Sequence, residues 1–144
     1  MKGRALGLDY GDARIGVALS DALWFTSRPL CTISRKNPID HKESLASISQ
    51  IVEENQVSVI ILGYPMHMNN DISENCKKTI AFQKQLKKAL PNIEVVLQDE
   101  RLTSKMAHNI LFEANIKAKD HKKHVDKMAA AILLQTYLDG QSTH

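Results

Sequence analysis

Hydrophobic residues alternate with small or polar residues along the first twenty positions of the chain. In residues 4–10, leucine and tyrosine fall on one face and alanine, glycine and Asp9 on the other, a two-residue period that predicts a β-strand. A Gly-Asp-Ala turn at 11–13 leads into a second alternating segment at 15–19, so the two strands are expected to pair as a hairpin. A third strand, predicted at 30–34 and preceded by Pro29, completes an opening sheet of three strands.

Helices and strands then alternate along the rest of the chain. Apolar residues at 45–52 follow a helical period, and Asp40 and Glu43 precede them with the spacing of a capping box. A β-branched run at 57–62, ended by glycine, is typical of a strand covered on both faces. Further elements are expected as a helix at 72–90, a strand at 93–97, a helix through 106–114 and a helix at 123–138. This order predicts one α/β domain over residues 1–144, a five-stranded mixed sheet with helices on both faces.

Composition and charge limit the class of protein. A chain of 144 residues with 43% hydrophobic content can bury one core but is short for two domains. We expect a cytoplasmic protein with no membrane partner, because the sequence has neither a signal-peptide pattern nor about 18 consecutive apolar residues. Cys31 and Cys76 fall in a predicted strand and a predicted helix, which favours reduced, packed thiols.

Three acidic residues stand where a fold of this kind would otherwise avoid them. Asp9 lies inside the first strand among apolar and small residues, where a carboxylate without compensation is destabilising. Glu100 follows a predicted parallel strand, at the sheet edge where α/β folds bind ligands. Asp126 lies beside the apolar stripe of the final helix, and the small residues at 129–131 permit close approach of that helix to the sheet. We therefore expect the three carboxylates to converge.

Each acid also has a purely structural interpretation. Asp9 could pair with Arg14 across the predicted turn, and Glu100 could be exposed or pair with the next residue, Arg101. The final acid could pair with Lys122, one helical turn earlier, or with Lys123. These ion pairs remain open alternatives to a shared site.

Convergence of the acids would imply a metal. Carboxylates held close together repel one another, and a hard divalent cation with oxygen ligands relieves that repulsion. One or two Mg²⁺ or Mn²⁺ ions held by Asp9, Glu100 and Asp126 would suit hydrolysis of a phosphodiester. Zinc is less suited, because His121 and His124 are separated by two lysines.

Basic residues cluster just before the final helix. The formal net charge is +3, and the stretch at 115–124 holds several lysines, Lys122 and Lys123 among them, with Arg101 shortly before. This cluster could line a phosphate-binding rim or form a solvated loop. The Gly63-Tyr64-Pro65 segment could line a groove or serve as an ordinary connection, and Trp24 could stack on a base, although core packing is the stronger expectation for it.

Four motifs together make the chain similar to the YqgF/RuvX family. They span nearly the whole chain in the order and spacing of that family: Leu8-Asp9-Tyr10-Gly11 with Arg14-Ile15-Gly16-Val17-Ala18, Gly63-Tyr64-Pro65 with Met68-Asn69, Asp99-Glu100-Arg101-Leu102-Thr103-Ser104, and Lys122-Lys123-His124-Val125-Asp126-Lys127-Met128-Ala129-Ala130. Members resemble Holliday-junction resolvases in fold, and they are described as nucleases of pre-16S ribosomal RNA. The resemblance implies a ribonuclease H-like fold.

The resemblance also implies roles for single residues. Metal-binding and catalytic roles fall to Asp9, Glu100 and Asp126, whereas Arg14 and Arg101 would support the site or the groove that takes the substrate. The chain departs from the family at Tyr64, where leucine is usual, and at residues 69–71, which read Asn-Asn-Asp where a glycine is common. These departures concern substrate contacts and leave the three acids in place.

Three functions are therefore open. The leading hypothesis is a nuclease that processes the 5′ end of pre-16S ribosomal RNA, with pre-ribosomal particles as partners and the protein a monomer or weak homodimer. A four-way DNA junction resolvase is the second, and it would need a symmetric dimer. A non-catalytic RNA-binding assembly factor is the third. An actin-like ATPase, suggested by Asp9-Tyr10-Gly11 alone, is disfavoured because such proteins bind nucleotide between two domains.

Overall fold

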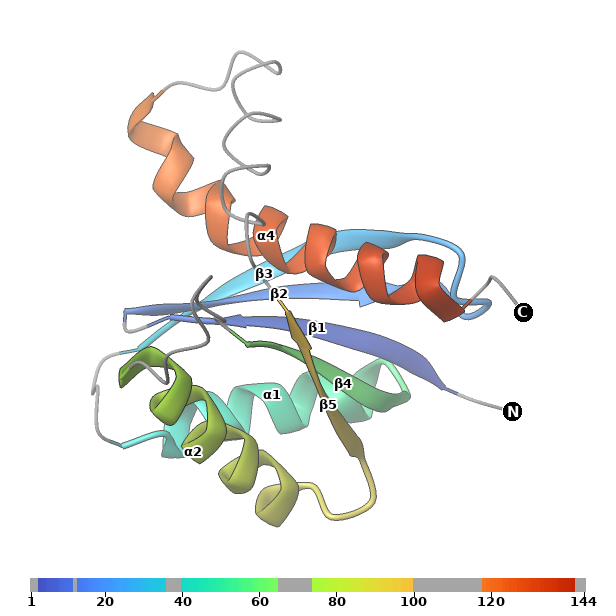
Figure 1. Cartoon of the computed structure of the whole chain (residues 1–144), viewed down its shortest axis with the longest axis horizontal. Helices are drawn as coiled ribbons and strands as arrows, with labels where there is room; N and C mark the ends of the chain where they lie inside the picture. Colours follow the sequence, from blue (N-terminus) through green and yellow to red (C-terminus); the bar gives the residue numbers. More distant parts are fainter. Residues whose placement is uncertain (1–2, 12, 36–39, 65–73, 100–117, 142–144) are drawn as a thin grey trace.

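The computed structural model describes residues 3–11, 13–35, 40–64, 74–99 and 118–141. Within these ranges a single sheet lies between helices (Figure 1). The helices and strands are, in chain order, β1 (Arg4–Tyr10), β2 (Arg14–Ser20), β3 (Ser27–Ser34), α1 (Lys42–Glu54), β4 (Val57–Tyr64), α2 (Glu74–Ala89), β5 (Glu94–Asp99) and α4 (Ala118–Gln141). Helices α1 and α2 cover one face of the sheet, and α4 covers the other.

The sheet is mixed, with strand order β3-β2-β1-β4-β5. The first three strands are antiparallel neighbours, whereas β1, β4 and β5 run parallel to one another. Leu8 lies opposite Val17 on one side and Leu62 on the other, and Leu62 lies opposite Leu97. The carboxyl ends of β1, β4 and β5 therefore meet at one edge of the sheet, and the predicted hairpin-led, five-stranded mixed sheet is confirmed.

The two faces of the sheet carry side chains of different size. The face covered by α1 and α2 holds large aliphatic residues, namely Leu6, Leu8, Ile15, Val17, Leu19, Ile60 and Leu62. The face covered by α4 carries smaller ones on the two central hairpin strands, Ala5 and Ala18, packed with Ala130, Leu133, Leu134 and Leu138 of the helix. Small side chains on this face bring α4 close to the strands.

Two glycines allow the backbone of α4 to pack directly against the backbone of the sheet. A Cβ atom built on Gly7 would lie 2.9 Å from the carbonyl oxygen of Ala130, and one built on Gly16 would lie 1.9 Å from the carbonyl oxygen of Asp126. The second distance is too short for any real side chain, so α4 can sit where it does only because residue 16 is glycine. The predicted close approach at 129–131 is confirmed, and all three alanines there are buried.

The third strand begins earlier than the proline had suggested. Pro29 was expected to precede this strand, and that prediction is wrong: Pro29 lies inside β3, opposite Ala18. Because β3 is at the edge of the sheet, one side of its backbone needs no ladder hydrogen bond. The register also shifts between Val17 and Ala18, which accommodates the proline at an irregularity.

Two predicted helix starts were also wrong. The N-cap of α1 is His41, with no side-chain cap, while Asp40 Oδ1 accepts a hydrogen bond from the Lys42 backbone N–H at 2.9 Å. Helix α4 begins at Ala118, inside the stretch expected to be a loop, since lysine and alanine favour helix and no glycine or proline interrupts 115–139. The helix predicted through 106–114 lies outside the described residues. In the described part of the chain, no helix combines the length and hydropathy needed to cross a bilayer.

Ser20 joins the first two strands through a buried hydrogen bond. Its hydroxyl accepts from the Ala5 N–H at 2.8 Å and donates to the Asp21 carbonyl at 2.9 Å, and the residue has no exposed surface. Ser20→Ala is therefore expected to lower the free energy of unfolding by about 1–3 kcal/mol, measured by urea denaturation, because it leaves buried polar groups without partners. Ser34→Ala, at an exposed position of β3, should change it by less than about 0.5 kcal/mol. Equal effects of the two substitutions would contradict this role.

Candidate active site

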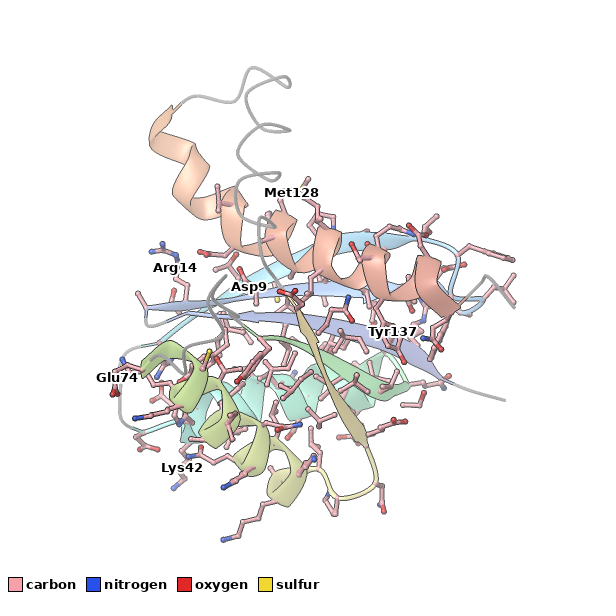
Figure 2. All side chains as sticks on the ribbon, viewed as in Figure 1. Asp9, Arg14, Lys42, Glu74, Met128 and Tyr137 are labelled. Carbon is pink, nitrogen blue, oxygen red and sulfur yellow. The ribbon has the colours of Figure 1, made fainter. Side chains whose placement is uncertain are left out.

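Asp9 stands near the carboxyl end of β1, on the face of the sheet that α4 covers. Side chains alternate along a strand, so Asp9 shares the face of Gly7, whose missing Cβ would meet Ala130 and Leu134 of α4. Its strand partner is Gly16 of β2, and the residue is partly buried. Figure 2 shows Asp9 between the sheet and α4.

Asp126 approaches the same end of the sheet from helix α4. It lies on α4 one turn before Ala130, and its backbone carbonyl presses on Gly16. Gly16 is the strand partner of Asp9, so Asp9 and the backbone of Asp126 both lie next to this glycine. Two of the three predicted acids are thus brought onto one face, at one end of the sheet.

Arg14 forms an ion pair with Asp126. Its Nε donates to Asp126 Oδ2 at 2.6 Å, with 39% of the Arg14 side chain and 21% of the Asp126 side chain exposed. The ion-pair alternatives considered from the sequence had joined Arg14 to Asp9, and Asp126 to Lys122 or Lys123. The observed pairing differs because α4 sits directly on β2, which places Asp126 beside Arg14 although the two are 112 residues apart.

Four other predicted site residues lie outside the described residues or in the early turns of α4. Glu100 and Arg101 lie outside the described residues; β5 ends at Asp99, at the sheet edge shared with the carboxyl ends of β1 and β4. The backbones of Lys122 and Lys123 belong to the early turns of α4. Their roles in metal and phosphate binding stay predictions.

Tyr64 ends β4, opposite Asp99 of β5. A hydrogen bond between its hydroxyl and the Cys76 thiol raises the pKa of Tyr64. Because Cys76 is a buried residue of α2, this contact lies on the side of the sheet away from α4. The structure therefore does not gather Tyr64 with Asp9 and Asp126, and its substrate contact also stays a prediction.

Trp24, the other aromatic candidate, donates from Nε1 to the Gly3 carbonyl at 2.8 Å and packs beside Tyr137, in agreement with the expected packing role.

Arg35 supports the turn that links the strands of Asp9 and Arg14. Its Nη1 donates to the Gly11 carbonyl at 2.6 Å, and its backbone N–H donates to the Ala13 carbonyl at 2.8 Å. The guanidinium also lies over the Tyr10 ring, 4.7 Å from the ring centroid. The sequence analysis missed this residue, because a lone arginine after a strand carries no local signal of the turn it will contact.

His41 completes this support from the start of α1. Its Nε2 is 2.6 Å from the Tyr10 hydroxyl, and its ring lies 5.1 Å from that of Phe82. Burial and the Arg35 cation lower the pKa of His41 below 6.5, and a hydrogen bond with Gln85 offsets part of that effect. The neutral ring is therefore the form that the folded protein favours.

The neutral His41 predicts a pH-dependent stability. The unfolded chain takes up a proton near pH 6.5 while the folded chain still resists it, so the unfolding free energy should fall as the pH drops below 6.5 toward the lower folded-state pKa. Urea midpoints measured between pH 7.5 and 5 test this. His41→Asn should flatten the dependence, and the same slope in the variant and the natural protein would exclude His41 as its source.

The donor set fits a hard divalent cation. Asp9 and Asp126 lie on the α4 side of the mixed sheet, near the edge where the parallel strands β1, β4 and β5 end, and Arg14 already compensates Asp126. Oxygen donors of this type are those that Mg²⁺ and Mn²⁺ take. Among the described residues no cluster of three such ligands occurs, and the third predicted acid, Glu100, lies beyond them.

Comparisons with known proteins agree with this geometry. The sequence profile of the RuvX family, described as Holliday junction resolvase, matches residues 3–140. Two relatives carry the name "Putative pre-16S rRNA nuclease": that of Shouchella clausii (strain KSM-K16) is 40% identical over 139 residues, covering 96% of each chain, and that of Clostridium novyi (strain NT) is 44% identical over 136 residues, covering 94% of this chain and 98% of the relative. The solved structure of T. thermophilus RuvC with a Holliday junction substrate matches with a TM-score of 0.58 at 12% identity, covering 98% of this chain and 96% of that one. That likeness shows the fold alone, and it confirms the expected ribonuclease H-like fold.

Proposed function

The chain belongs to the RuvX family, and from this membership we propose that it is a metal-dependent nuclease that hydrolyses phosphodiester bonds of nucleic acid. The observation that carries the proposal is the placement of Asp9 and Asp126 beside the same glycine, Gly16, although one comes from β1 and the other from α4. Arg14 compensates Asp126, and a divalent cation bound beside both acids would compensate the two charges together.

The proposed metal ligands are Asp9, Glu100 and Asp126, with one or two Mg²⁺ or Mn²⁺ ions as the cofactor. Such ions, when bound, lower the pKa of water and stabilise negative charge at phosphorus. The protein itself contributes orientation. The rigid β1–β2 hairpin carries Asp9, the contact with Gly16 fixes the height of Asp126 above the sheet, and Arg35 holds the intervening turn.

The proposed substrate is the 5′ end of pre-16S ribosomal RNA in pre-ribosomal particles of the cytoplasm, in line with the name that the relatives carry. Arg14, Arg101, Lys122 and Lys123 would contact its phosphates, and Tyr64 would contact a more distant part of the substrate. Their positive charge favours any polyanion and does not by itself select RNA over DNA.

The description of the family as Holliday junction resolvase supports a second candidate, cleavage of four-way DNA junctions. That activity needs two active sites acting together and hence a dimer, whereas an RNA nuclease can act as a monomer or weak homodimer. A third candidate is an RNA-binding assembly factor without hydrolytic activity.

A cleavage assay with both substrates separates these candidates. An RNA that spans the 5′ boundary of 16S ribosomal RNA and a four-way DNA junction would be incubated in parallel with Mg²⁺, with Mn²⁺ or with EDTA. We expect metal-dependent cleavage of the RNA and none with EDTA. Cleavage of the junction alone would favour the resolvase, and tight RNA binding without cleavage under any metal would favour the assembly factor.

A further inference from the structure

The Arg14–Asp126 ion pair engages an oxygen that the proposed metal centre requires. Arg14 Nε donates to Asp126 Oδ2 at 2.6 Å, and 21% of the Asp126 side chain is exposed. A carboxylate oxygen that accepts so short a charge-assisted hydrogen bond is a weaker metal ligand than one released from it. A cation entering beside Asp9 and Asp126 must therefore compete with Arg14.

The charges at the site indicate that a bound divalent cation would displace Arg14. Asp9 and Asp126 are both partly buried on the α4 side of Gly16, and the Arg14 guanidinium compensates the charge of Asp126. A divalent cation bound at the same carboxylates would supply that compensation and would repel the guanidinium. Arg14 can move away, because its side chain is 39% exposed and extends from the first residue of β2.

We propose that Arg14 is a displaceable counter-ion of Asp126: a divalent cation takes the carboxylate, and the released guanidinium binds a phosphate of the nucleic acid. This inference rests on the proposed function. A guanidinium suits both states, because its several N–H donors match a carboxylate and a phosphate equally well. The exchange makes metal and nucleic acid bind cooperatively, since each partner of the ion pair is freed for one of the two ligands, and such coupling is reciprocal.

Mn²⁺ binding measured by electron paramagnetic resonance tests the exchange without any activity assay. Arg14→Gln should bind Mn²⁺ about 5-fold more tightly than the natural protein, the lower end of typical coupling between sites, because the competing cation is gone. Arg14→Lys should stay close to the natural affinity, because it keeps the charge. Arg28→Gln, which removes an exposed positive charge from β3, controls for net charge and should leave Mn²⁺ affinity unchanged within about 2-fold.

The opposite sign would overturn the inference. If Arg14 simply held Asp126 in place for the metal, Arg14→Gln would weaken Mn²⁺ binding or leave it unchanged while circular dichroism still reported a folded protein. A second readout uses a single-stranded 12-mer of deoxythymidine as the phosphate probe. Mn²⁺ should tighten binding of this probe more in the natural protein than in Arg14→Gln, and an equal gain in both would contradict the release of Arg14.

If the proposed function is wrong, Mn²⁺ binding by the natural protein and by Asp9→Asn will show it independently of Arg14. If the natural protein shows no saturable Mn²⁺ binding, or if Asp9→Asn binds Mn²⁺ as the natural protein does, the metal centre itself is wrong and the exchange falls with it. If Asp9→Asn loses Mn²⁺ but Arg14→Gln does not gain affinity, the metal centre stands and only the exchange is rejected.

Discussion

Asp9→Asn is expected to reduce RNA cleavage by at least about 100-fold, since loss of a residue that merely supports a metal ligand already reduces metal affinity or activity by about 10- to 100-fold. The substitution keeps the size of the side chain and removes one of the two negative charges that lie beside Gly16. The neutral amide is a poor ligand for Mg²⁺ or Mn²⁺, so the variant should fold normally and fail to act. The rate of cleavage of the 16S boundary RNA at saturating metal measures the effect.

Asp139→Asn provides the matched control for Asp9→Asn. Asp139 is exposed on α4, three to four turns beyond Asp126, and its carboxylate accepts a hydrogen bond from Gln135. This variant loses the same charge far from the site, so its cleavage rate should stay within about 2-fold of the natural protein, as for surface substitutions away from special features. Similar activity in Asp9→Asn and Asp139→Asn would remove Asp9 from the chemistry.

Gly16→Ala is expected to affect stability and activity together. The new Cβ would lie 1.9 Å from the carbonyl oxygen of Asp126, an atom of the helix backbone that cannot rotate away. Helix α4 must then shift off the hairpin, which should lower the free energy of unfolding by roughly 1–3 kcal/mol or more, as overpacking does. Cleavage should fall as well, because the shift moves Asp126 away from Asp9. Urea denaturation and the cleavage rate report the two effects.

Gly140→Ala is the control for Gly16→Ala. Gly140 lies in the last turn of α4, and a Cβ built there meets nothing within 4 Å. Alanine favours helix over glycine, so this variant should be unchanged or more stable by up to about 1 kcal/mol, with normal cleavage. If Gly16→Ala behaved like Gly140→Ala, the close seating of α4 on β2 would be refuted.

Much of the fold could be predicted because it depends on local periodicity. Alternating residues gave the β1–β2 hairpin, and the β-branched run gave β4, since each pattern reports which faces of one segment are buried. Pro29 misled the prediction for β3 because its cost depends on whether a strand is at an edge, which only the assembled sheet decides. The start of α4 was missed for a related reason, since a charged segment can be helix or loop with the same composition.

The candidate site, like the fold, could be predicted from the sequence only where the signal was local. Asp9 and Asp126 could be identified because a strand-interior acid and an acid beside an apolar helix face are locally unusual. Their common position beside Gly16, and the pairing of Asp126 with Arg14, depend on which strand the helix covers. Small residues on one face of both hairpin strands, Gly7 and Gly16 with Ala5 and Ala18, were the signal that could have indicated this contact.

We propose that carboxylates from β1 and α4 share a divalent cation. Crystals of the natural protein soaked in Mn²⁺, with the ion located by its anomalous scattering, test it most directly. We expect a peak bonded to oxygens of both Asp9 and Asp126, at about 2.1 Å as for Mg²⁺, with Arg14 turned away from Asp126. A map in which Mn²⁺ binds elsewhere, while Arg14 and Asp126 stay paired at saturating metal, would contradict it.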